Sequence, residues 1–192
     1  MRAGWGAVVL TGGTAARMGG ADKATLELGG STLLERALAA TSAAAEVVVV
    51  GEPVPTSRPV TWTREQPARG GPAAGLLAGL DAFPERPELV AVLAVDMPQV
   101  SPQTFTRLTA ALEQQDVDGA LLLDEGGRRQ LLCAVYRSAA LQRARPRERA
   151  EEHGLPVRAL LGPLRLAEVP ALADEARDVD TWEDLRALRD PT

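Results

Sequence analysis

Residues 7–23 read AVVLTGGTAARMGGADK, an apolar run that passes into a loop of glycines with one arginine and one lysine. The apolar part predicts a buried strand. Glycines let backbone N–H groups approach an anion closely and line an anion-binding concavity. Arg17 and Lys23 add the positive charge that several phosphates need. The stretch therefore predicts a strand followed by a loop that wraps a polyphosphate.

The spacing within this loop excludes the two commonest phosphate-binding loops. A P-loop needs Gly-x-x-x-x-Gly-Lys-Ser/Thr, whereas Lys23 follows Asp22 and precedes Ala24. A dinucleotide fingerprint needs Gly-x-Gly-x-x-Gly, a spacing that the glycines of this loop do not supply. A flexible glycine linker is the plainer alternative, but both cations lie among the glycines directly after a strand. This arrangement favours phosphate binding.

Strand and helix patterns alternate along the rest of the chain. Short apolar runs predict strands, and helical spacing with capping signals predicts the helices between them. The predicted strands are 47–50, 59–63, 89–95, 119–123, 130–136 and 165–169. The predicted helices are 32–45, 73–82, 101–115, the interrupted segment 138–161 and a last helix from 181. Because right-handed strand–helix–strand units build parallel sheets, the pattern predicts an α/β fold. With no repeat or linker visible, we expect one domain over residues 1–192.

Asp96 directly follows residues 89–95, the longest apolar run of the chain. Such a run predicts a central strand, and the carboxyl ends of central parallel strands are where open α/β sheets bind ligands. Aspartate also caps turns and helices, so a local structural role is the alternative. The position favours a ligand-binding carboxylate.

Composition narrows the class of protein. The net charge of −5 and the pI near 5.0 argue against a general nucleic-acid binder or an anionic-membrane binder. Cys133 is the single cysteine, so no disulfide framework is possible, and its apolar neighbours predict a buried thiol without a catalytic role. No signal peptide and no membrane-spanning run is visible, which predicts a soluble cytoplasmic protein.

Four motifs occur in an order that resembles one family. Residues 10–23 fit the pattern Leu-x-Gly-Gly-x-x-x-Arg-Met-Gly-x-Asp-Lys once one extra glycine is allowed, and 71–76, 93–98 and 178–185 read GPAAGL, LAVDMP and DVDTWEDL. From about residue 7 to residue 188 the chain resembles the nucleotidyltransferases related to molybdenum cofactor guanylyltransferase. The resemblance implies a Rossmann-like three-layer nucleotidyltransferase fold with a mostly parallel central sheet. It also implies Mg²⁺-dependent transfer of GMP from GTP to molybdopterin.

The resemblance also implies roles for individual residues. Arg17, Lys23 and Asp96 are the expected catalytic residues, the first two on the phosphates. The expected metal ligands are Asp96 and, at a position where relatives carry Asn or Asp, Asp180. The expected nucleotide-binding residues are Leu10, Thr11, Gly12, Gly13, Lys23, Glu65, Gly71, Pro72 and Asp96. GTP and a molybdopterin-type acceptor are the expected small-molecule partners. Molybdoenzymes or cofactor-biosynthesis proteins are candidate protein partners of a monomer or weak oligomer.

Three positions depart from the family pattern. Thr11 stands where alanine is common and brings a hydroxyl, an extra donor and acceptor, next to the expected base. Gln130-Leu131 replaces Gln-Pro, and Trp182 replaces proline. Gly12, where cytidylyl relatives tend to carry alanine, leaves room for a purine, so GTP is expected over CTP.

The sequence leaves two other functions open. The same chemistry with CTP, or with a sugar or polyol phosphate acceptor, is one alternative. A nucleotide-binding protein without turnover is another, although the charged Lys23 and Asp96 argue against it. No Gly-x-Ser-x-Gly motif or Cys–His pair is evident, so catalysis by positioning and charge neutralisation is expected.

Overall fold

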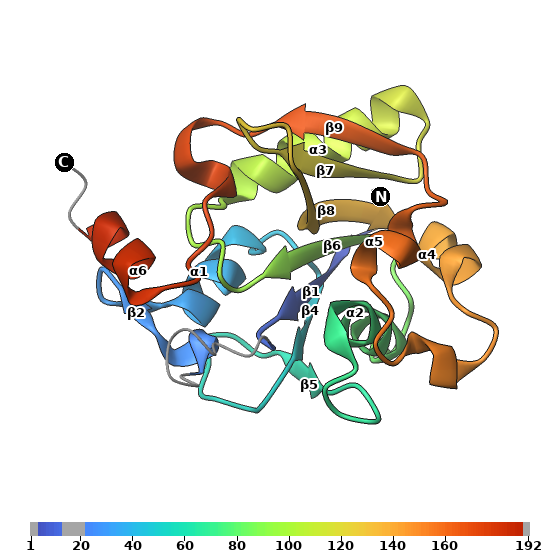
Figure 1. Ribbon diagram of the computed structural model, residues 1–192, viewed down its shortest axis with the longest axis horizontal. Coiled ribbons are helices and arrows are strands. Elements are labelled where there is room, and N and C mark those ends of the chain that lie inside the picture. The colour runs from blue at the N-terminus through green and yellow to red at the C-terminus, as the bar shows by residue number, and fades with distance from the viewer. Residues whose placement is uncertain (1–3, 13–21, 190–192) are drawn as a thin grey trace.

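The computed structural model describes residues 4–12 and 22–189. In this part of the chain a seven-stranded sheet has the order β5-β4-β1-β6-β8-β7-β9 (Figure 1). Its strands are β1 Gly6–Leu10, β4 Glu46–Val50, β5 Thr61–Thr63, β6 Leu89–Ala94, β7 Gly119–Leu123, β8 Arg129–Arg137 and β9 Leu166–Pro170. All neighbouring pairs are parallel except those that β8 makes with β6 and β7. The expected three-layer α/β fold with a mostly parallel sheet is confirmed.

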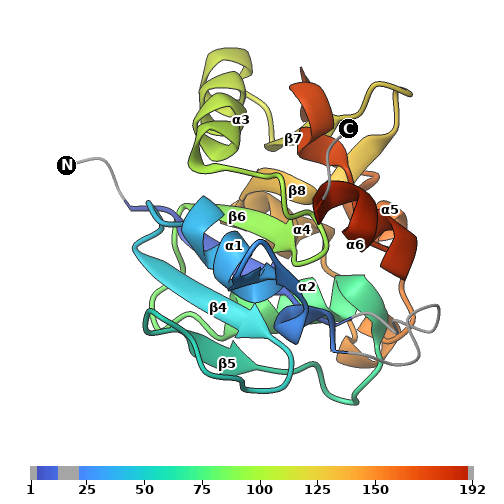
Figure 2. The ribbon, with the colours of Figure 1, turned by 90° about the vertical axis from the view of Figure 1, so that its left-hand side faces the viewer.

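Helices cover both faces of this sheet (Figures 1 and 2). The helices are α1 Leu33–Ala40, α2 Gly71–Asp81, α3 Pro102–Gln115, α4 Ser138–Ala144, α5 Val157–Leu161 and α6 Trp182–Arg189, with a small hairpin of β2 Glu27–Leu28 and β3 Ser31–Thr32 before α1. Within residues 4–12 and 22–189, none of the helices has the length and apolar character needed to cross a membrane.

Two hydrophobic cores result from the alternation of side chains along the strands. Ala7 and Val9 of β1 face one core, which α1, α3 and α6 cover, whereas Val8 and Leu10 face the other, which α2, α4 and α5 cover. Successive side chains of a strand point to opposite faces, so a strand buried on both faces reads as a continuous apolar run. This pattern explains why β1, β4 and β6 were visible in the sequence.

Element ends differ from the predictions for local reasons. α1 ends at Ala40 rather than near residue 45, because the Thr41 hydroxyl donates back to the Ala37 carbonyl and the chain leaves the helical conformation there. The segment 138–161, predicted as an interrupted helix, separates into α4, a 3₁₀ turn at Arg149–Glu152 and α5. Gly154, with φ of 76°, adopts the left-handed conformation that a helix cannot continue through.

A cluster of one arginine and two carboxylates ties the segment after α4 to α2. Arg145 donates from Nη1 and Nη2 to the two carboxylate oxygens of Asp81, at 2.7 and 2.8 Å, and from Nε to Glu152 Oε1 at 2.7 Å. The Arg145 side chain is only 12% exposed. We call Arg145, Asp81 and Glu152 the arginine cluster.

The carboxyl ends of β1, β4 and β6 meet at one edge of the sheet. The loop residues that leave these strands are joined by backbone bonds: Thr11 donates to the Val50 carbonyl at 3.1 Å, and Val95 donates to the Leu10 carbonyl at 3.0 Å. Helix α6 lies beside β2 at the left of Figure 1, the end of the molecule that faces the viewer in Figure 2. The C-terminal helix is therefore brought to the same end as the residues that follow the glycine loop.

Candidate active site

Lys23 lies in a short 3₁₀ turn, Lys23–Thr25, immediately after the glycine loop. The Asp22 carboxylate caps this turn by accepting a hydrogen bond from the backbone N–H of Ala24 at 3.0 Å. Capping fixes the first backbone donors of the turn, and with them the direction of the lysine side chain. Lys23 is only 7% exposed, so its four-carbon stem is packed against protein rather than solvent.

Asp96 stands in the turn that follows β6, as the sequence predicts. Its backbone carbonyl accepts a hydrogen bond from Val179 N–H at 2.8 Å, which draws residues 178–180 alongside the end of β6. Val179 is fully buried. The segment before α6 is therefore anchored directly beside the central strand.

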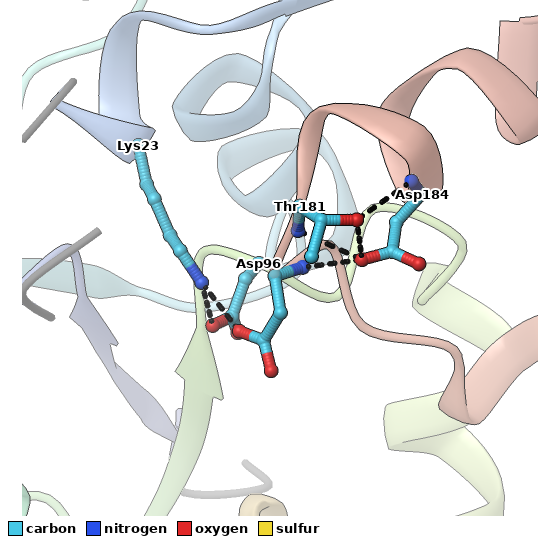
Figure 3. A network of polar contacts seen from close by, with 5 residues as sticks. Lys23, Asp96, Thr181 and Asp184 are labelled. Atoms are coloured by element: carbon cyan, nitrogen blue, oxygen red, sulfur yellow. Dashed lines mark hydrogen bonds and ion pairs between the residues drawn. The ribbon is translucent and has the colours of Figure 1, made fainter. Parts of the chain in front are cut away.

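The Lys23 ammonium lies between two carboxylates (Figure 3). Lys23 Nζ is 2.9 Å from Asp96 Oδ2 and 2.9 Å from Asp180 Oδ1. Burial acts to lower the pKa of Lys23, but its hydrogen bonds to Asp180 and Asp96 outweigh burial and raise that pKa, so the side chain is charged at neutral pH. We call Lys23, Asp96 and Asp180 the lysine cluster. It unites three segments that are far apart in the sequence.

Asp184 holds Asp180 in place, a role that the sequence analysis missed. Asp184 Oδ2 accepts hydrogen bonds from the backbone N–H of Asp180 at 3.1 Å and from the N–H and hydroxyl of Thr181, both at 2.7 Å (Figure 3). Donation by Thr181 lowers the pKa of Asp184, because these bonds favour the ionised form. The spacing of Thr181 and Asp184 predicts a cap for the last helix, but it gives no sign of the hydrogen bond that holds Asp180.

Asp178 is a further carboxylate near the lysine cluster that was not predicted as a site residue. Burial, together with the negative charges of Asp180 and Asp96, raises the pKa of Asp178. The alternation Asp178-Val179-Asp180 indicates that Asp178 lies on the same side as Asp180. In an extended segment, a buried central residue places its two neighbours on the opposite side. Negative charge is therefore concentrated around a single ammonium group.

Thr11 and Gly12, two of the expected nucleotide-binding residues, directly follow strand β1. The Thr11 hydroxyl donates to the Val50 carbonyl at 3.0 Å, so its hydrogen is not free for a base as the sequence analysis had expected. The hydroxyl fits because residue 51 is glycine, where a Cβ would overlap Thr11 Oγ1. A Cβ added to Gly12, in contrast, would have no atom of residues 4–12 and 22–189 within 4 Å apart from its chain neighbours. None of the described residues fills the space beside Gly12, and the Thr11 hydroxyl retains only its acceptor capacity.

The other predicted nucleotide-binding residues divide into two groups. Glu65 lies in the loop after β5, where it accepts the Arg69 backbone N–H at 2.9 Å, and Gly71-Pro72 forms the first turn of α2. No hydrogen bond or ion pair among the described residues joins them to the lysine cluster. Glu65 lines a cavity of about 200 Å³ between this loop, α2 and the segment around Arg145. Gly13 and Arg17 lie outside the described residues.

Gln130-Leu131, one of the three departures from the family pattern, lies near the start of strand β8. The Gln130 side-chain amide donates to Asp124 Oδ2 at 3.1 Å, which closes the hairpin between β7 and β8. Cys133 of the same strand is fully buried, and burial raises the pKa of its thiol well above the ordinary value. The expectation of an inert, buried cysteine agrees with this environment.

The lysine cluster has the donor set that Mg²⁺ prefers. Asp96 and Asp180 present carboxylate oxygens that converge on one cation, and Mg²⁺ binds through one or two carboxylates completed by phosphate oxygens and water. Among residues 4–12 and 22–189, no group of three or more His, Cys, Asp or Glu side chains forms a dedicated metal cage. The residues present fit a metal that is shared with a phosphate ligand.

Comparison with known sequences gives one consistent result. Residues 7–169 match the MobA-like NTP transferase domain. A molybdenum cofactor guanylyltransferase from Bradyrhizobium sp. (strain ORS 278) is 33% identical over 127 residues, which is 62% of this chain and 60% of that protein. A probable molybdenum cofactor guanylyltransferase from Mycobacterium tuberculosis (strain ATCC 25618 / H37Rv) is 38% identical over 138 residues, 68% of this chain and 67% of that protein.

Solved structures share the fold. Molybdopterin-guanine dinucleotide biosynthesis protein A from Archaeoglobus fulgidus superimposes with a TM-score of 0.72 at 22% identity, over 96% of both chains. The 2-C-methyl-D-erythritol 4-phosphate cytidylyltransferase from Thermus thermophilus gives a TM-score of 0.65 at 24% identity, over 98% of both chains. At such identities the likeness concerns the fold alone, because one fold hosts several substrates.

Proposed function

The chain belongs to the MobA-like NTP transferase family and is a nucleotidyltransferase, and from this premise we propose that it transfers GMP from GTP to the terminal phosphate of a molybdopterin-type acceptor. The observation that carries the proposal is the lysine cluster, in which Asp96 and Asp180 face one cation at the carboxyl edge of the sheet. The names of the relatives supply the acceptor and the base.

The reaction needs no nucleophile from the protein. An oxygen of the acceptor phosphate attacks the α-phosphorus of GTP and forms a new P–O bond. The bond from that phosphorus to the oxygen bridging to the β-phosphate breaks, and pyrophosphate leaves with the electron pair. In-line displacement of this kind depends on positioning and on neutralising negative charge.

Each charged residue has a part in this scheme. Asp96 and Asp180 would hold Mg²⁺, which supplies positive charge to the phosphate oxygens when it is bound. Lys23 and Arg17 would bind the β- and γ-phosphates and stabilise the charge that develops on the departing pyrophosphate. Residues 10–13 would contact the base and ribose, and Glu65 with Gly71-Pro72 would complete the nucleotide side.

Base preference is the sharpest test of the guanylyl assignment. Pyrophosphate release is measured with GTP, CTP and ATP, each with and without molybdopterin and with a sugar phosphate in its place. We expect GTP to be preferred over CTP by at least about tenfold, roughly 1.4 kcal/mol, a demand that one or two buried hydrogen bonds meet. Equal use of GTP and CTP would contradict the proposal that the enzyme is a guanylyltransferase, although it would still be a nucleotidyltransferase.

Gly12→Ala sharpens the same measurement. The added methyl group contacts none of the described residues, so the fold should be unaffected, but the methyl group would narrow the space proposed for the base. The preference for GTP over CTP should therefore shrink in the variant. Nucleotide binding without any pyrophosphate release, with every acceptor tried, would instead favour a binding protein without turnover.

A further inference from the structure

Lys23 occupies the point on which the two proposed metal ligands converge. Its Nζ is 2.9 Å from one oxygen of Asp96 and 2.9 Å from one oxygen of Asp180. It is also the single lysine of the chain, because all other basic residues apart from His153 are arginines. The residue proposed to bind phosphates, Lys23, is thus paired with both carboxylates proposed to bind the metal.

We propose that Lys23 is a resident cation, which holds the metal position in the nucleotide-free protein and gives it up when a divalent cation and a nucleoside triphosphate bind. The displaced ammonium then moves onto the triphosphate. The proposal rests on the proposed function in assigning Asp96 and Asp180 to the metal.

Electrostatics favours such an exchange. A divalent cation and an ammonium group cannot share two carboxylate oxygens, because like charges a few ångströms apart repel strongly in a partly buried site. Without the ammonium, the carboxylates of Asp96, Asp178 and Asp180 would repel one another. A cation that stays in place until the metal arrives removes both difficulties.

The chemistry of lysine suits a movable cation. Its compact ammonium sits on a flexible four-carbon stem and can turn to a new partner, whereas the planar guanidinium of arginine favours a fixed, bidentate geometry. Asp96 is 26% exposed and Asp180 is 48% exposed, so solvent reaches the carboxylates while the lysine stem stays buried. A hydrated metal ion can therefore approach from the solvent side without unfolding the site.

The first test measures metal binding without nucleotide. Mn²⁺ is titrated into the purified full-length chain, and free Mn²⁺ is followed by electron paramagnetic resonance. Lys23→Met keeps the apolar stem but removes the charge, so Mn²⁺ should bind about tenfold more tightly than to the wild type. Arg158→Met, which removes an exposed positive charge elsewhere, serves as the matched control and should leave the affinity unchanged.

An unchanged or weaker Mn²⁺ affinity in Lys23→Met, with the far-ultraviolet circular dichroism of the wild type, would overturn the proposal. So would equal tightening in Arg158→Met, because the effect would then reflect net charge alone. Adding Asp180→Asn to Lys23→Met should reverse the gain. Failure of that double variant to bind more weakly would place the metal elsewhere and would also count against the proposal.

The second test uses the fact that the chain has one lysine. Lysine labelled with ¹³C and ¹⁵N gives a single side-chain spin system by nuclear magnetic resonance, free of overlap. We expect its Cε and Nζ signals to move when Mg²⁺ and a non-hydrolysable GTP analogue are added together. Signals that stay at their ligand-free positions, although the analogue binds, would show that Lys23 keeps its carboxylates and would overturn the exchange.

The cation exchange at Lys23 and the guanylyltransferase activity can be contradicted separately. Tighter Mn²⁺ binding in Lys23→Met without any GTP-dependent turnover in the wild type would uphold the exchange and contradict the guanylyltransferase. Turnover with GTP and molybdopterin, combined with unchanged Mn²⁺ affinity in the variant, would uphold the enzyme and contradict the exchange.

Discussion

The arginine cluster and the lysine cluster both place one cation between carboxylates, yet the two differ in how the cation is held. The guanidinium of Arg145 uses three nitrogens in bonds of 2.7 to 2.8 Å, two of them to a single carboxylate. The ammonium of Lys23 makes one bond of 2.9 Å to each of two carboxylates. A planar group bound at three atoms keeps one orientation, whereas an ammonium group can change partners and keep its charge. From this difference we propose that the arginine cluster serves stability and the lysine cluster serves the reaction.

The largest effect should follow from an acid-to-amide change in the lysine cluster. Asp96→Asn should lower Mg²⁺-dependent turnover by about 100- to 1000-fold, the size expected when an electrostatic contact made in the transition state is lost. Asp81→Asn, the same chemical change in the arginine cluster, is the matched control and should keep kcat within about twofold. Pyrophosphate release measures both, and circular dichroism verifies the fold. Near wild-type turnover in Asp96→Asn would end the metal role.

Removing the cation of the arginine cluster should affect stability rather than turnover. Arg145→Met leaves Asp81 and Glu152 partly buried without their main partner, which should cost about 2 to 3 kcal/mol in the free energy of unfolding. Arg149 retains its 3.0 Å bond to Asp81, so we expect a smaller loss of stability than if both carboxylates were left without any cation. Urea unfolding gives this number. Loss of turnover with unchanged stability would reverse the division of roles between the clusters.

Exchanging the two cations sharpens the comparison further. Arg145→Lys keeps the charge but loses the planar fork, so it should cost about 1 kcal/mol of stability. We expect Lys23→Met to lower turnover, because it removes the charge proposed to bind the phosphates. Lys23→Arg should not restore that turnover, because a planar guanidinium differs in size and geometry from a compact ammonium. Thermal unfolding and steady-state kinetics on the two swaps check these outcomes. Full activity in Lys23→Arg would mean that charge alone matters there.

The smallest effect concerns pH. The hydrogen bonds from Arg145 hold the pKa of Asp81 below its ordinary value, despite burial, which acts to raise it. Stability from this pair is therefore fully present above the ordinary aspartate pKa, about 4, and is lost as the pH falls through the lower pKa of the folded state. Urea unfolding at pH 7, 5 and 3 should show the wild type and Arg145→Met differing equally at pH 7 and 5 and converging at pH 3. A difference that grows towards pH 3 would contradict this assignment.

Local pattern predicted the elements better than it predicted their partners. Residues 119–123 form the strand that their apolar run indicated, and Asp96 stands where a carboxylate after a central strand should stand. The pairing of Lys23 with Asp180 was not predicted, because it spans 157 residues of chain and depends on how α6 packs. Periodicity reports on neighbours in the sequence, and a long-range ion pair leaves no such trace.

The segment around Arg145 shows the same limit. Its arginine-rich sequence carries no sign that one of these side chains is buried, because burial depends on Asp81, which α2 presents from 64 residues away. The Thr11 hydroxyl was misjudged for a similar reason. Its hydrogen goes to the Val50 carbonyl, an acceptor that only the β1–β4 pairing brings within reach.

Because strand β8 is antiparallel, the two halves of the carboxyl edge of the sheet differ in how far their loops can change in length. On the half formed by β4, β1 and β6, every connection that reaches the edge must cross back over the sheet, so its length is constrained. On the other half, β8 pairs Cys133 with Leu93, and its first residues together with the turn 124–127 extend past the end of β6. A hairpin tip can gain or lose residues without moving Asp96 or the lysine cluster. The turn between β7 and β8 is therefore a place where hairpins of other lengths can be grafted while Asp96 and Lys23 keep their positions.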